Sequence, residues 1–124
     1  MTEAEKIQAL VRQRLDQATE AVSAAELNLA NGFERSAVNR AYYAMFYAVL
    51  ALLAASQTET SRHSAAIAQF DQAYVKPALL RKEFSRWLHE AFPHRQAADY
   101  GTEVALTRDE IEQRYRQFVA LTEF

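Results

Sequence analysis

The 124-residue chain contains no cysteine, only two glycines and only two prolines. Without cysteine, the chain can form neither a disulfide framework nor a thiolate zinc site. Two glycines far apart in the sequence cannot form a phosphate-cradling loop or a dinucleotide-binding fingerprint, because both need several glycines at fixed spacing. So few glycines and prolines also leave few turns, which disfavours all-β and α/β folds.

An excess of charge of one sign is also missing, because the formal net charge is −2. The chain therefore lacks the overall basic character of a protein that coats nucleic acid, although this does not exclude a local basic patch. Hydrophobic residues make up 50% of the chain, which argues against disorder. No basic segment followed by an apolar run occurs near the N-terminus, so we expect no signal peptide and a cytoplasmic protein.

The longest apolar run, residues 41–55, contains only apolar residues and tyrosine. It is shorter than the roughly 20 apolar residues that a membrane span needs. Its alanine and leucine content favours a helix, and a helix with so little polar surface is a buried one. The sequence therefore predicts a central helix over about 33–55, with the other helices packed around it and no membrane contact.

Four further helices are predicted around the central one. Apolar residues three and four apart from Ala4 to Leu29 predict an amphipathic helix that ends at a left-handed Gly32. Shorter helices are predicted from Ser61 to Tyr74, from a first turn at Pro77 to about Pro93, where we expect a kink or an end, and over about 107–119. Residues 1–124 are therefore predicted to form one all-α domain, an up-and-down helical bundle of about five helices.

Polar and aromatic residues on the central helix form the first candidate binding group. Arg40 and Tyr43 share one face of this helix, and Tyr47 continues that face. An arginine beside a tyrosine suits a phosphate with a stacked base. The alternative is that both tyrosines pack against a neighbouring helix while Arg40 reaches solvent. His63, at the start of the third helix, lies where free N–H groups favour an anion, but it could also act in proton transfer, cap the helix or face solvent.

The second candidate group lies on the fourth helix, whose apolar stripe continues past Leu88 and Ala91 to Arg95. A guanidinium on an inward face needs a partner, and Asp99 follows one turn later. Either the two residues form a salt bridge that stabilises the kinked helix, or Arg95 is directed into a cleft where it can bind phosphate. No metal site is predicted nearby, because His89 and His94 are five residues apart rather than the four that would let both reach one metal.

Three segments of the chain resemble HEPN domains: Asn-Arg-Ala-Tyr-Tyr-Ala-Met-Phe-Tyr-Ala at 39–48, Ser-Arg-His-Ser at 61–64 and Arg-Gln-Ala-Ala-Asp-Tyr-Gly at 95–101. Their order and spacing match over nearly the whole chain. The resemblance implies a helical bundle that dimerises and works on RNA or nucleotides. Many HEPN proteins are ribonuclease toxins paired with a small nucleotidyltransferase antitoxin. Their active motif is an arginine followed four to six residues later by histidine, often with a tyrosine nearby.

The chain departs from this motif at the histidine. Arg95 matches the arginine, but Tyr100 stands at the fifth position after it, and no histidine follows Arg95. Metal-free RNA cleavage needs a group that deprotonates or orients the 2′-hydroxyl and a cation that holds the phosphate. Arg95 could supply the cation, and His63, or less readily Asp99 or Tyr100, could supply the other group.

These observations predict a polar cleft that binds a nucleotide or RNA, without a cofactor or metal. The expected catalytic residues are Arg95 and His63, and the expected ligand-binding residues are Arg40, Tyr43, Asp99 and Tyr100. The expected role is that of the HEPN partner of a small nucleotidyltransferase in a toxin–antitoxin pair. The alternatives are an active ribonuclease toxin with a variant site and a purely structural dimerisation module.

We predict that the protein is a homodimer. Seven phenylalanines, six tyrosines and one tryptophan are many for a small bundle to cover, and Trp87 and Phe92 are candidates for an exposed apolar patch, which usually marks an interface. Light scattering at micromolar concentration should give twice the chain mass of 14.1 kDa. A mass equal to one chain would refute the prediction.

Overall fold

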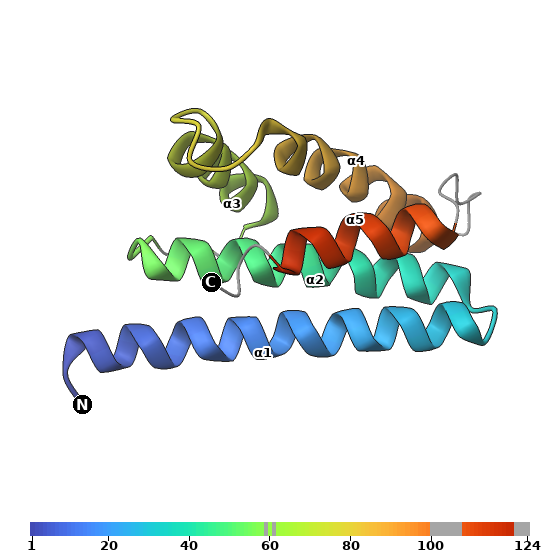
Figure 1. Ribbon diagram of the computed structural model, residues 1–124, viewed down its shortest axis with the longest axis horizontal. Coiled ribbons are helices and arrows are strands. Elements are labelled where there is room, and N and C mark those ends of the chain that lie inside the picture. Colours follow the sequence, from blue (N-terminus) through green and yellow to red (C-terminus); the bar gives the residue numbers. More distant parts are fainter. Residues whose placement is uncertain (59, 61, 100–107, 121–124) are drawn as a thin grey trace.

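The computed structural model describes residues 1–58, 60, 62–99 and 108–120, with residues 91–99 and some residues of the last helix described by their backbone alone. The elements are α1 (Glu3–Ala30), α2 (Glu34–Ala55), α3 (His63–Phe70), the π-helical turn η1 (Asp71–Val75), α4 (Lys82–Asp99) and α5 (Arg108–Ala120) (Figure 1). No strand occurs in this described part of the chain. The predicted all-α fold is therefore confirmed.

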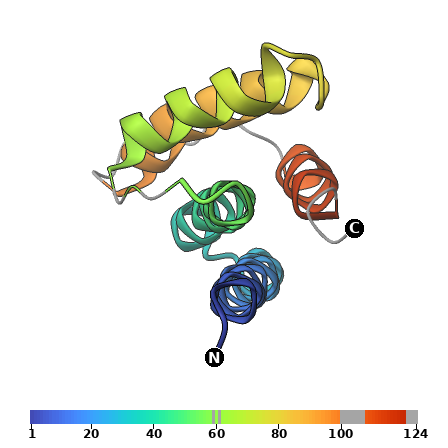
Figure 2. The same ribbon diagram turned by 90° about the vertical axis from the view of Figure 1, so that its left-hand side faces the viewer.

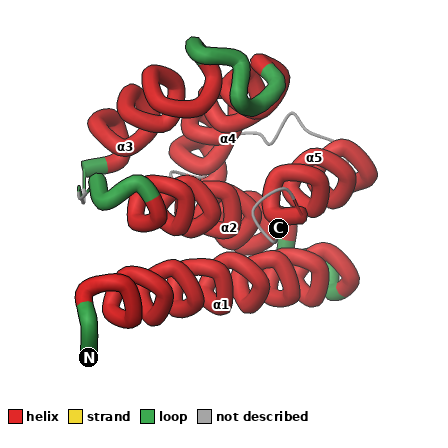
Figure 3. Tube along the Cα trace, turned by 60° about the vertical axis from the view of Figure 1, so that its left-hand side comes forward, coloured by secondary structure: helices red, strands yellow, loops and turns green. Residues whose placement is uncertain are grey.

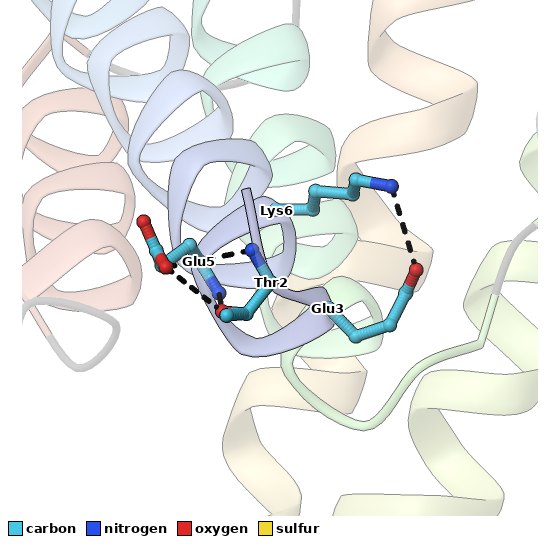
Figure 4. A network of polar contacts seen from close by, with 4 residues as sticks. All are labelled: Thr2, Glu3, Glu5 and Lys6. Carbon is cyan, nitrogen blue, oxygen red and sulfur yellow. Dashed lines mark hydrogen bonds and ion pairs between the residues drawn. The ribbon is translucent and has the colours of Figure 1, made fainter.

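A capping box begins α1. The Thr2 hydroxyl accepts a hydrogen bond from the Glu5 N–H at 3.1 Å, and the Glu5 carboxylate accepts one from the Thr2 N–H at 3.4 Å (Figure 4). Glu3 and Lys6 form an ion pair at 3.5 Å on the same turn. The two reciprocal bonds satisfy N–H groups that have no partner within the helix, and so fix its first turn.

The turn between α1 and α2 is the one predicted at Gly32, which has a φ of 79°. The Phe33 N–H donates to the Asn28 carbonyl at 2.8 Å, and the Gly32 N–H donates to the Leu29 carbonyl at 3.1 Å. These two bonds define a Schellman motif, in which glycine adopts the left-handed conformation without a Cβ clash. The chain then reverses, and α2 lies antiparallel beside α1 (Figure 1).

Helix α2 is the centre of the fold, as predicted. It packs against α1, α3, α4 and α5, and more than half of its residues are buried. By length and by a mean hydropathy of 1.3 this helix could cross a membrane, but 67% of its most apolar window is buried inside the protein. That burial is typical of the core helix of a folded domain.

The remaining helices cover the face of α2 that α1 leaves open. Viewed along the long axis, α1, α2 and α5 appear end-on, whereas α3 and α4 run across α2 on the side away from α1 (Figure 2). An ion pair between Glu26 and Arg116 links α1 to α5. The crossing of α3 over α2 places the start of α3 next to side chains near the middle of α2.

The region around Pro77 differs from the prediction. Pro77 does not begin the fourth helix; it lies in the turn after η1, and α4 begins only at Lys82. The residues after Pro77 form hydrogen bonds with the end of η1 instead. The Ala78 N–H donates to the Val75 carbonyl and the Leu80 N–H donates to the Tyr74 carbonyl, both at 2.9 Å. The predicted helix start was therefore wrong: the fixed φ of proline suits this turn as well as a first helical turn.

Pro93 does not end the fourth helix, because α4 continues to Asp99. The expected apolar patch is also different. Trp87 is half-buried against the core and meets Phe84 edge-on, with ring centroids 5.1 Å apart. The Phe92 side chain lies outside the described residues. The large apolar side chains that are exposed in the described part of the chain are Met1, Leu27, Phe33 and Leu79.

We predict that Gln57→Gly stabilises the protein. Helix α2 ends in the same motif as α1, with the Thr58 N–H on the Leu53 carbonyl at 2.8 Å, but Gln57 occupies the left-handed position with a φ of 59°. Removing the Cβ should raise the free energy of unfolding by about 0.5–1 kcal/mol, after the added flexibility of the unfolded chain is subtracted. Urea unfolding measures the effect. Gln57→Ala keeps the Cβ and should show no gain; an equal gain in both variants would contradict the explanation.

Candidate functional site

Helix α3 lies over α2 (Figure 3). Three of the six predicted site residues come together where α3 begins. Arg40 and Tyr43 lie on α2, and His63 is the first residue of α3. The Arg40 guanidinium carbon lies 5.1 Å from the centre of the Tyr43 ring. The Tyr43 and His63 rings meet edge to face, with their centroids 5.8 Å apart. The three side chains therefore form one continuous group.

The His63 ring is held by two buried side chains of α2. The Tyr42 hydroxyl and Nδ1 of His63 share a hydrogen bond of 2.7 Å. The Phe46 ring stacks on the His63 ring with centroids 4.0 Å apart and 12° between the planes. Tyr42 and Phe46 are four residues apart and thus lie one turn from each other on the same helix face. Together they fix both the position and the plane of the imidazole.

The Arg40 side chain is half-buried and held by neutral groups. Its Nε and Nη2 donate to the Asn39 side-chain oxygen at 3.2 and 3.0 Å, and its charge lies over the Tyr43 ring. In the described part of the chain, no carboxylate lies within ion-pair distance of Arg40. Among the described contacts, the guanidinium charge therefore meets an amide oxygen and the face of a ring.

The two tyrosines pack against the core, and their part in binding a ligand stays a prediction. Tyr43 and Tyr47 are partly buried against the core, and their rings lie 6.0 Å apart at a tilt. Tyr43 also supports Arg40, so packing and a contribution to the site are compatible. The short separation between Arg40 and Tyr43 follows from their three-residue spacing on one helix.

The other three predicted site residues cannot be placed. Arg95 and Asp99 lie on the described backbone of α4, but their side chains are outside the described residues, as is Tyr100 as a whole. Because α4 continues past Pro93, positions 95 and 99 are one turn apart, as the predicted pair requires. The pairing and the roles of these residues stay predictions.

Tyr42 and Phe46 are site residues that the sequence interpretation missed. By its helical spacing Tyr42 looks like an ordinary core residue, and it is completely buried. A signal was nevertheless available, since a buried tyrosine hydroxyl needs a hydrogen-bond partner. The partner comes from a residue 21 positions later in the chain, which helix periodicity cannot identify.

We predict that His63→Ala destabilises the protein by about 2 kcal/mol, because it removes the stack on Phe46 and leaves a buried hydroxyl without its histidine partner. His89→Ala is the matched control. His89 pairs with Asp71 at 2.7 Å but is 55% exposed, so its removal should cost less than about 1 kcal/mol. Chemical denaturation compares the two variants. Equal losses would show that the His63 contacts contribute little.

Comparison with known proteins identifies the family. The HEPN domain family profile matches residues 11–123. The chain is 38% identical to the UPF0332 protein of Thermotoga maritima, over 94% of this chain and 86% of that one. It is 34% identical to "Putative toxin MJ0142" and 33% identical to "Putative toxin MJ0605" of Methanocaldococcus jannaschii, over 79% and 80% of this chain and 67% and 71% of theirs. The predicted resemblance is confirmed, and the chain belongs to the HEPN domain family.

Proposed function

We propose that this HEPN-family protein binds RNA or a nucleotide at the surface formed by Arg40, Tyr43 and His63. The observation that carries the proposal is that α3 brings His63 against the Arg40–Tyr43 pair. A guanidinium supplies donors for a phosphate, and its plane or an aromatic ring can stack on a base. An imidazole supplies a further donor or, in its other protonation state, a base.

The electrostatics of the site support an anionic ligand. The chain as a whole is slightly acidic, so attraction for a phosphate must come from a local group of charges. Arg40 is such a charge, because its hydrogen bonds go to a neutral amide. His63 adds the N-terminal end of α3, where backbone N–H groups favour negative charge. In this proposal Arg95, Asp99 and Tyr100 complete the same cleft from α4 and the segment after it.

The wider role that we propose is that of the HEPN partner of a small nucleotidyltransferase in a toxin–antitoxin pair. The support is the family membership, together with two relatives whose names call them putative toxins. A homodimer located in the cytoplasm belongs to this proposal. A nucleotidyltransferase gene beside this one, and copurification of the two proteins after co-expression, would support the role.

Ribonuclease activity is the second candidate. The two relatives are named putative toxins, and the resemblance to HEPN domains implies that many toxins of this family are ribonucleases. Arg95 would hold the phosphate and His63 would act on the 2′-hydroxyl, without metal. Shortening of an RNA probe by the purified protein, with growth arrest on expression, would replace binding by cleavage as the function. Intact RNA under conditions where the protein binds it would favour the binding role.

We predict that Arg40→Ala weakens binding of labelled RNA and of ATP about tenfold, because a charge-assisted contact to phosphate is lost. Fluorescence anisotropy at several salt concentrations should show the slope of log K against log[salt] fall by about 0.7 for single-stranded RNA. Arg95→Ala belongs in the same series.

The matched control is Arg12→Ala, which removes an arginine of α1 that is 74% exposed and pairs with Asp16. It should leave affinity and salt slope unchanged. Equal binding by the Arg40 and Arg12 variants, or no wild-type binding of RNA and ATP at high micromolar concentration, would overturn the proposed site, and the structural-dimer alternative would replace it.

A further inference from the structure

The basic residues of the chain are concentrated in the segment that begins beside the surface formed by Arg40, Tyr43 and His63. Residues 62–82 contain four arginine or lysine residues and one aspartate, which gives a formal charge of +3. The rest of the chain has ten basic and fifteen acidic residues and therefore carries −5. A polyanion is thus attracted to this segment more strongly than to the chain as a whole.

Most of the positive charges in this segment are not neutralised. Arg62 directly precedes α3, Lys76 directly follows η1, and Lys82 is the first residue of α4. All three are exposed, and within the described part of the chain none of them forms an ion pair. Arg81 differs, because its Nε lies 4.0 Å from the Glu83 carboxylate. Three cationic side chains are therefore available to an anionic ligand.

The exposed face of α3 and η1 between these charges carries no carboxylate. Its positions follow one another at four-residue spacing and are all exposed: Ser64, Ala68, Gln72 and Lys76. The acidic residue of this segment, Asp71, is half-buried and bonds to Nε2 of His89 at 2.7 Å. We call the exposed positions from Arg62 to Lys76 the α3 surface. It belongs to the part of the fold that lies across α2 on the side away from α1 (Figure 2).

The α3 surface is too long for one nucleotide. Arg62 and Lys76 are 14 positions apart in the chain, and at about 1.5 Å of rise per residue they are separated by roughly 20 Å. One strand of a duplex advances about 3.4 Å per nucleotide, so about six stacked nucleotides cover the same distance. A ligand that uses the charges at both ends must therefore be an oligonucleotide.

We propose that the ligand is single-stranded RNA, whose backbone runs from the surface of Arg40, Tyr43 and His63 along the α3 surface to Lys76 and Lys82. The proposal rests on the function proposed above and deepens it, because it selects an RNA strand over a free nucleotide. Lysine binds phosphate as a point charge and does not read a base, so contacts at the far end add affinity without sequence preference.

Salt dependence distinguishes a bound strand from a short ligand. Fluorescence anisotropy compares a labelled uridine trinucleotide with a uridine dodecanucleotide. Each phosphate bound by a lysine adds about 0.7 to the slope of log K against log[salt], so the slope should be steeper by about 1.4 for the dodecanucleotide. A short site also binds the longer RNA more tightly, because more positions are available, but this changes the affinity and not the slope. Equal slopes would overturn the inference.

The two lysines are tested with the double variant Lys76→Gln and Lys82→Gln, which removes both charges. For the dodecanucleotide the slope should fall by about 1.4 and the affinity by about 25-fold at about 0.1 M salt, whereas trinucleotide binding should not change. The matched control is Lys6→Gln with Arg12→Gln, two residues of α1 that are 59% and 74% exposed. Circular dichroism establishes that both variants are folded. Equal losses of affinity in the two double variants would overturn the inference, because net charge alone would explain them.

The outcomes distinguish this inference from the proposed function. If Arg40→Ala weakens binding of ATP and the trinucleotide, but the dodecanucleotide has the same slope as the trinucleotide, the proposed function stands and the role of the α3 surface is wrong. If dodecanucleotide binding depends on the two lysines but not on Arg40, the α3 surface binds RNA and the proposed site is wrong. If the wild type binds none of these probes, both are wrong. Displacement of the dodecanucleotide by polyglutamate at equal charge concentration would assign the α3 surface to an acidic protein instead.

Discussion

The fold depends on the burial of α2, a helix with too little polar surface to face water. Because apolar residues surround it on most sides, the stable arrangement is one in which α1, α3, α4 and α5 all pack against it. Alanine at many of its positions lets the neighbouring backbones approach closely. A polar group on the buried part of α2 must find a partner inside the protein, and the Tyr42 hydroxyl does so by bonding to His63. The core and the candidate site are therefore parts of one packing arrangement.

Features governed by neighbouring residues could be predicted from the sequence. The α1–α2 hairpin follows from three-four apolar spacing and from a glycine that can adopt a positive φ, and both were found as expected. Arg40 and Tyr43 were also predicted together, since three residues along a helix bring them to one face. Such features are set within one or two helical turns, so one sequence contains the information that fixes them.

Features that depend on contacts between distant segments could not be predicted. Pro77 is compatible with a helix start and with a turn. The turn forms here because carbonyls of η1 accept hydrogen bonds from N–H groups that follow Pro77 in the chain. Tyr42 reads as a core residue by periodicity, and only the crossing of α3 over α2 reveals its hydroxyl as a partner of His63. The conformation of Gln57 could not be predicted either. Its own sequence does not favour a positive φ, and it adopts one because the chain ends α2 in a left-handed turn.

The histidine of the candidate site comes from a different helix than the motif histidine of HEPN domains would. The histidine expected near Arg95 is missing, and the histidine that the structure places against an arginine-bearing surface comes instead from the first turn of α3. Its ring is fixed by Tyr42 and Phe46, two side chains that are needed to fill the core. The bond to Tyr42 and the stack on Phe46 limit the rotation of this imidazole. Such anchoring would suit the proposed binding of phosphate, because a group that is already oriented loses little entropy when a ligand binds.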